Sequence, residues 1–144
     1  MDTDQMQKFF KKVENIKLVE NFKMTESENT YQFEYKSALM TASQTTKEQL
    51  TVSKINYGLQ YEDLLKDITL NQIYETMNKY NKKFNIIKII LHKVDGLNVY
   101  MRFSVEYSIP DNLFESLKIE DMEDNLKLII GASEIFIKSL AEDY

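Results

Sequence analysis

The side chains that could do chemistry are few, and the one histidine, His92, is the first candidate. A catalytic histidine needs a nucleophile or a carboxylate close to it in space. Asp95 and Glu106 could supply a carboxylate, but only if the strands around His92 pair in a suitable register. We interpret His92 as an ordinary solvent-facing strand residue.

A cluster of carboxylates is the second candidate: Glu120, Asp121, Glu123 and Asp124. Positions 120, 123 and 124 share one helix face and could meet a cation there. A hard cation such as Ca²⁺ takes about six or more oxygen ligands from a shaped loop, which a straight helix face does not supply. Acidic residues also stabilise a helix N-terminus. The cluster therefore predicts a solvated helix start and no metal site.

Several kinds of active site have no matching residues in the sequence. Without Cys there can be no disulfide, thiolate zinc site, iron–sulfur cluster or Cys nucleophile. Gly-rich phosphate loops, His-Glu-x-x-His, Gly-x-Ser-x-Gly and EF-hand loops are also missing. We expect no catalytic residue, no metal, no cofactor and no enzymatic activity.

Charge and hydropathy exclude further classes of partner. The 144 residues carry 18 Lys and Arg against 23 Asp and Glu, a net charge of −5, and Arg102 is the only Arg. Such a chain is a poor nucleic-acid binder. The apolar stretch at 86–91 is broken by Lys88 and is too short to span a bilayer. With no signal-peptide pattern at the N-terminus and no Cys, we expect a cytoplasmic protein that binds neither nucleic acid nor membrane.

The elements that must position these residues follow from apolar periodicity. Helical spacing predicts a first helix around Met6, Phe9, Phe10 and Val13, and further helices at 70–84, 111–117 and 119–141. Asp67 or Thr69 could cap the second of these helices.

Alternating apolar and polar residues predict five strands, at 18–24, 31–36, 50–57, 84–94 and 97–109. Gly58 is expected to end the third strand, and the polar stretch 41–49 reads as a loop. The order α-β-β-β-α-β-β-α predicts a single α+β domain over residues 1–144, an antiparallel sheet with helices packed on one face. Gly131, inside the last helix, suggests a close approach of that helix to the sheet.

The register of the last hairpin has two alternatives. A two-residue Asp95-Gly96 loop would place Lys88 and His92 on the dry face. A loop one residue longer would set Ile87, Ile89 and Leu91 against Val105, Phe103 and Met101. A slip of one residue moves every side chain of the strand to the opposite face, so burial of the apolar residues decides the register. We favour the longer loop for this reason.

The nine Tyr and eight Phe are a generous supply of aromatic residues. Tyr is common at protein interfaces because it buries area while keeping a polar tip. The candidate partner-binding residues are Tyr31, Tyr35, Tyr57 and Tyr100. The alternative, which we favour, is that most Tyr residues fill the core of the sheet.

One segment resembles a known family. The sequence around the middle helix contains Asn78, Tyr80, Asn81 and Phe84, followed by an apolar hairpin with Asp95-Gly96 at its turn and a long helix. It resembles the bacterial YbjN family, which shares the fold of type III secretion chaperones. Tyr80 replaces the usual Trp, and the basic stretch before Phe84 is shorter than in the family.

The resemblance implies a regulator or a chaperone-like protein. The YbjN family carries only a loose label as sensory-transduction regulators, and its chaperone relatives are small, acidic, usually dimeric proteins that hold a partly unfolded client. Asn78 and Asn81 lie three apart near the end of a helix, where Asn can cap backbone groups or fix the turn into the next strand. We interpret the motif as structural.

Our first hypothesis is a non-catalytic protein-binding or chaperone-like module, a homodimer whose client lies extended along a sheet edge or in an apolar groove. The alternatives are a regulator that senses a small ligand in a pocket between sheet and helices, and an immunity or phage counter-defence inhibitor.

Overall fold

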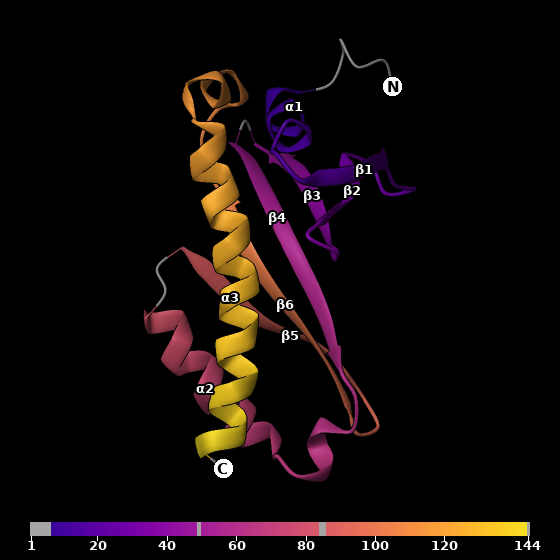
Figure 1. Cartoon of the computed structure of the whole chain (residues 1–144), viewed down its shortest axis with the longest axis vertical. Helices are drawn as coiled ribbons and strands as arrows, with labels where there is room; N and C mark the ends of the chain where they lie inside the picture. Colours follow the sequence, from indigo (N-terminus) through magenta and orange to yellow (C-terminus); the bar gives the residue numbers. More distant parts are fainter. Residues whose placement is uncertain (1–6, 49, 84–85, 144) are drawn as a thin grey trace. The chain divides into compact units, whose positions relative to one another are not determined.

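The structure, a computed structural model, describes residues 7–48, 50–83 and 86–143 (Figure 1). The helices are α1 (Lys8–Glu14), α2 (Leu70–Lys83) and α3 (Ile119–Asp143), with short 3₁₀ helices η2 (Leu64–Lys66) and η3 (Asp111–Ser116). The strands are β1 (Val19–Met24), β2 (Thr30–Tyr35), β3 (Ala38–Lys47), β4 (Leu50–Tyr61), β5 (Ile87–Asp95) and β6 (Asn98–Tyr107). They form one antiparallel sheet in the order β1-β2-β3-β4-β6-β5, which confirms the α+β class.

The residues group into two compact units. Unit 1 comprises Met1–Asn56 and Glu106–Lys127, and unit 2 comprises Tyr57–Val105 and Leu128–Tyr144. Strand β4, strand β6 and helix α3 contribute residues to both units. That the chain acts as a single domain stays a prediction.

In unit 1 the core is aromatic. Helix α1 buries Phe9, Phe10 and Val13, the apolar spacing that predicted it, while Met6 lies outside the described residues. The Phe9 ring contacts those of Phe10, Tyr107 and Phe114 at centroid distances of 5.3, 5.9 and 5.1 Å. These contacts hold α1 against η3 and the end of β6.

In unit 2 helix α2 begins with a reciprocal cap. The Thr69 N–H donates to Gln72 Oε1 at 2.8 Å, and the Gln72 N–H donates to Thr69 Oγ1 at 3.2 Å. This capping box satisfies backbone donors that a helix start leaves unpaired, and it selects Thr69 over Asp67 as the cap. The helix buries Ile73, Thr76 and Tyr80.

The β5–β6 hairpin has the favoured register. Ile87, Ile89 and Leu91 pair with Val105, Phe103 and Met101, and Phe103 meets Phe136 of α3 at 5.8 Å between ring centroids. The loop itself differs from the prediction. The turn is Gly96-Leu97, since Asp95 pairs with Asn98, and a β-bulge between Leu91 and Lys93 supplies the extra residue.

The predicted loop at 41–49 is wrong, because strand β3 runs through Lys47 and gives six strands where we expected five. Met40, Ala42 and Gln44 alternate toward the core. The third of these is polar, and its Nε2 donates to the buried Ser53 Oγ at 2.8 Å. A polar side chain at an inward position concealed the alternation.

Two expectations for glycine are also wrong. Gly58 does not end β4, which continues to Tyr61, because an extended glycine can remain in a ladder. Gly131 does not mark a close helix approach, because a Cβ built there meets no heavy atom within 4 Å beyond its own helix and chain neighbours.

Replacing Gly131 with Ala is therefore expected to stabilise the protein by about 1 kcal/mol, through helix propensity alone. Gly96→Ala is expected to destabilise it by about 1–2 kcal/mol, because Gly96 has a φ of +62° in the hairpin turn. Urea unfolding of both variants checks this pair, and destabilisation by Gly131→Ala would contradict the open space beside that residue.

Candidate functional site

The structure does not bring the four candidate tyrosines to one surface. Tyr31 and Tyr35 belong to the core of unit 1, where they are 4% and 0% exposed. Tyr57 and Tyr100 are half-buried in unit 2. Tyr31 and Tyr35 therefore fit the alternative in which the tyrosines fill the core of the sheet. A binding role for Tyr57 and Tyr100 stays a prediction.

Tyr35 has a structural partner in the acidic cluster. Its hydroxyl donates to Glu123 Oε2 at 2.9 Å. The pKa of Tyr35 is raised to about 12, first by burial, then by the hydrogen bond and charge of Glu123, and last by the charge of Asp124. Glu120 and Asp121 lie in the first turn of α3, where carboxylates favour the helix dipole. Within residues 7–48, 50–83 and 86–143, no three His, Asp or Glu residues lie where they could hold a metal ion.

Tyr35 gives a pH-dependent prediction. Because its folded pKa is raised above the unfolded value of 10.0, its contribution to stability is complete below pH 10 and is lost as the pH rises toward 12. The difference in unfolding free energy between the wild type and Tyr35→Phe should be constant from about pH 8 to 10 and shrink above that. Urea titrations along this series test it, and a difference that does not change with pH would contradict the Tyr35–Glu123 assignment.

Asn81 bonds to the backbone of strand β5. Its Nδ2 donates to the Ile89 carbonyl at 3.0 Å, and its Oδ1 accepts from the Ile89 N–H at 2.8 Å. Strand β5 is the last strand of the sheet, so Asn81 occupies the two backbone groups that another strand would use at Ile89.

The other motif residues are also placed in unit 2. Tyr80 is buried, with Lys79 Nζ and Lys83 Nζ at 5.6 and 5.9 Å from its ring centroid. Asn78 is exposed on α2, and Asp95 and Gly96 lie at the hairpin turn. Phe84 lies outside the described residues.

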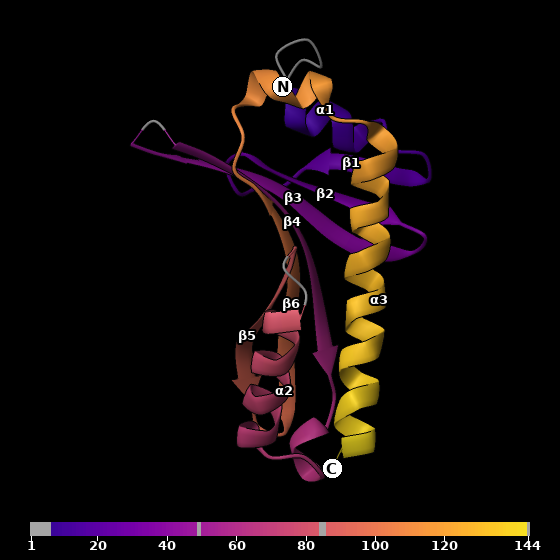
Figure 2. The same cartoon turned by 90° about the vertical axis from the view of Figure 1, so that its left-hand side faces the viewer.

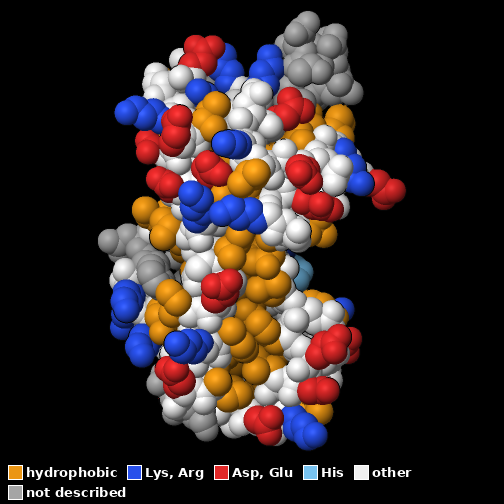
Figure 3. Space-filling view, in the orientation of Figure 1, with side chains coloured by type: hydrophobic (Ala, Val, Ile, Leu, Met, Phe, Trp, Pro, Cys, Tyr) orange, Lys and Arg blue, Asp and Glu red, His pale blue; other side chains and the backbone are white. Residues whose placement is uncertain are grey.

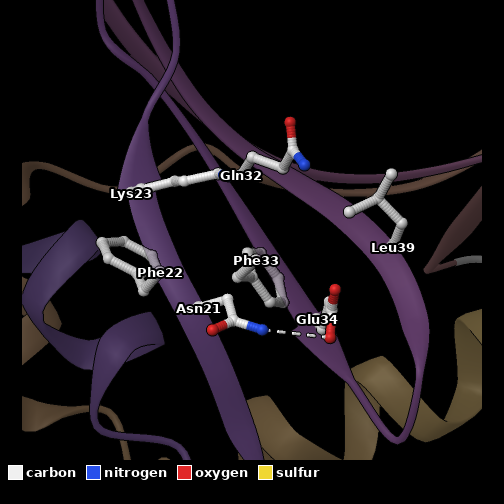
Figure 4. Close-up of a pocket in the computed structure, with 7 residues that line it drawn as sticks. All are labelled: Asn21, Phe22, Lys23, Gln32, Phe33, Glu34 and Leu39. Atoms are coloured by element: carbon white, nitrogen blue, oxygen red, sulfur yellow. Dashed lines mark hydrogen bonds between the residues drawn. The ribbon is translucent and has the colours of Figure 1, made fainter.

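At the opposite edge of the sheet, β1 is interrupted. Its pairing with β2 shifts between Glu20 and Lys23, and Asn21 has a φ of +56°. A hollow of about 210 Å³ lies here, where Asn21 Nδ2 donates to Glu34 Oε2 at 3.2 Å, and Phe22 and Phe33 also line it (Figure 4). A bulge of this kind protects an edge strand from further pairing.

The open face of the β5–β6 pair carries a group of basic side chains, and by strand alternation it also carries Asp95 near the turn and Glu106 near the end of β6. Because paired residues share a face, Lys88, Ile90 and Lys93 lie beside Ser104, Arg102 and Tyr100. We call the following set the basic face: Lys88, Ile90, His92, Lys93, Tyr100 and Arg102. Lys93 Nζ lies 5.6 Å from the Tyr100 ring centroid, and Ile90 is 40% exposed. An acidic chain thus presents four nitrogen-bearing side chains on one strand pair.

His92 belongs to the basic face and not to a catalytic pair. Its Nδ1 lies 3.3 Å from Arg102 Nη2. A guanidinium only donates, so Nδ1 is the acceptor in this contact. In the described part of the chain the hydrogen-bond partner of His92 is thus a cation, whereas a general base is usually oriented by a carboxylate.

Helix α3 also exposes apolar side chains. Leu128 and Ile135, both in unit 2, are 44% and 45% exposed. Figure 3 shows hydrophobic side chains gathered along the lower half of the face that α3 presents in Figure 1. Among the described residues, no helix is both long enough and apolar enough to cross a membrane.

The basic face was not predicted from the sequence. Lys88, Ile90 and His92 alternate along one strand, and this alternation could have indicated a shared face. The favoured register assigned that face to solvent, without any further role. Lys93 lies on the same face because of the bulge, and Arg102 lies there because it pairs with Ile90 across the strands.

No family model and no curated protein matches this sequence. Solved structures with a similar fold include an uncharacterized protein from Methanothermobacter thermautotrophicus, with a TM-score of 0.61, 12% identity, and coverage of 94% of this chain and 96% of that chain. YbjN from E. coli, a candidate transcription regulator, gives a TM-score of 0.46 at 8% identity over 85% of this chain and 84% of that chain. The likeness to the first of these structures shows the fold alone.

Proposed function

We propose that this chain is a non-catalytic protein-binding module that holds an acidic polypeptide segment against its basic face. The observation that carries the proposal is the gathering of Lys88, Lys93 and Arg102 around the exposed Ile90 on a chain of net charge −5, with His92 beside Arg102. Electrostatic complementarity of this kind selects a partner and speeds its association.

The spacing of the face fits an extended partner. Residues on one face of a strand are two apart, which is about 7 Å. An extended segment with a carboxylate at every second residue repeats at the same distance. The side chains of Ile90 and Tyr100 supply apolar contact between the charges.

This surface differs from the sheet edge that the sequence hypothesis named. Strand addition at β1 is disfavoured by its bulge, and at β5 Asn81 already bonds both backbone groups of Ile89. A partner that uses the open face needs neither edge. The side chains that contact the partner come from β5 and β6, so the positions of their charges set the partner's register on the face.

Binding of labelled probes tests the proposal. The first probe is a short peptide that alternates Glu with Val, the second has Lys in place of Glu, and the third is a single-stranded oligonucleotide. We expect saturable binding of the acidic peptide alone, weakened by salt, with amide shifts confined to β5 and β6. Absence of acidic-peptide binding, equal binding of the Lys peptide, or tighter binding of the oligonucleotide would overturn the proposal.

We propose in addition that two copies associate through α3. Leu128 and Ile135 are seven residues apart, so they share one exposed face of the helix. Light scattering should give twice 17.1 kDa for the wild type and the monomer mass for Leu128→Glu/Ile135→Glu. A wild-type monomer at high concentration would refute it. The role of inhibitor in immunity or counter-defence, and the cytoplasmic location, stay predictions.

A further inference from the structure

A second hollow lies entirely within unit 2, between the β4–α2 connection and the end of α3. Figures 1 and 2 show these two segments side by side. The cavity has a volume of about 340 Å³. Its apolar lining comes from Leu64, Ile68, Ile137 and Leu140. Ile68 and Leu140 are 8% and 1% exposed, so the cavity has a buried apolar floor.

One wall of the cavity is fixed by backbone hydrogen bonds to the β5–β6 hairpin. The Asp63 N–H donates to Asn98 Oδ1 at 2.9 Å, and the Leu65 N–H donates to the Leu97 carbonyl at 3.1 Å. The 3₁₀ turn is closed by the Asp67 N–H, which donates to the Leu64 carbonyl at 3.3 Å, and the Ile68 N–H donates to the same carbonyl at 3.1 Å. A wall held in this way is formed before a ligand arrives, which lowers the entropic cost of binding.

The charges of the described residues at the rim are all negative. Glu62, Asp63 and Asp67 line the cavity, and no Lys or Arg is among the described residues of the lining. The C-terminal turn of α3 adds the negative end of a helix dipole, with no basic side chain in that turn. Lys138, one turn earlier, lies 3.9 Å from Glu142 and is not part of the lining.

We propose that this cavity binds a small organic amine, a protonated nitrogen attached to an apolar body of about the size of an indole. The buried floor accommodates the apolar body, and the rim carboxylates meet the ammonium group. A bare metal ion is a poor alternative, because in the described residues no three carboxylate or imidazole groups converge as metal ligands. The inference is independent of the proposed function, since the two surfaces share no residue.

Three indole probes of matched shape separate charge from apolar fit: tryptamine, tryptophol and indole-3-propionate. The protein has no Trp, so excitation selective for indole reports the ligand without protein background. We expect saturable binding of tryptamine with a blue-shifted emission. Tryptophol should bind about tenfold more weakly, and the propionate more weakly still. Failure of tryptamine to bind, or equal binding of all three probes, would overturn the proposal.

Variants then locate the site. Glu62→Gln/Asp67→Asn should weaken tryptamine binding about threefold to tenfold and leave tryptophol unchanged. Ala141→Leu extends a side chain at the rim on an exposed helix position, where Leu is a good helix former, and should weaken both probes. Glu142→Gln removes a charge from the same helix turn without touching the lining, and should change neither. Equal effects of the double variant and of Glu142→Gln would show that only net charge matters and would refute the site.

Discussion

Phe9→Ala is expected to destabilise the protein by about 3–5 kcal/mol, the range for removing a fully buried aromatic ring. Phe9 is 0% exposed and its ring touches Phe10, Tyr107 and Phe114. Each ring pair adds about 0.5–1.5 kcal/mol beyond the area buried. Because α1 has only 7 residues, it cannot be stable by itself, and loss of this anchor should release it.

Chemical denaturation followed by circular dichroism and hydrogen exchange measures this effect. Phe9→Ala could leave too little folded protein to titrate, since a domain has only about 5–15 kcal/mol of stability. Phe9→Leu keeps most of the apolar volume and should lose clearly less. Lys17→Ala, on an exposed residue after α1, serves as the control. A Phe9→Ala loss no greater than that of the control would contradict the aromatic core of unit 1.

Charge reversal on the basic face is expected to reduce binding of the acidic peptide at least tenfold. Lys88→Glu/Lys93→Glu places carboxylates where the partner's own carboxylates would lie, and like charges in contact oppose association. Both side chains are exposed, so the fold should persist. Lys93→Glu also removes the cation over the Tyr100 ring, which contributes to the loss if Tyr100 contacts the partner.

Lys17→Glu/Lys127→Glu is the matched control, because it changes the net charge equally at two exposed positions outside the basic face. Fluorescence anisotropy with the Glu-Val peptide compares the three proteins. If both double variants weaken binding equally, the peptide responds to net charge and the basic face is not a site. Asn81→Ala frees the backbone groups of Ile89 at the edge of the sheet. Tighter binding of the peptide by that variant would show that the peptide binds at the β5 edge and not on the open face.

Much of the local structure could be predicted because it depends on neighbours in the sequence. Thr69 and Gln72 lie within one helical turn, and the alternation along β6 reveals its buried face without knowledge of its partners. The core pairs of the β5–β6 hairpin also followed, since only one register buries both Ile89 and Phe103. Strand β3 failed this test because Gln44, an inward residue, is polar and needs Ser53 from the next strand.

By itself, the sequence determined the class of fold, the positions of the three helices and most strands, and the absence of cysteine chemistry. The tertiary structure decided which side chains meet. It placed Tyr35 against Glu123, 88 residues away along the chain. It also brought Asp67 to Ile137 in one cavity and joined Lys93 to Tyr100 and His92 to Arg102 on one face. Periodicity carries information about the direction in which a side chain points, but the groups that it meets depend on the packing of distant segments, which no local pattern encodes.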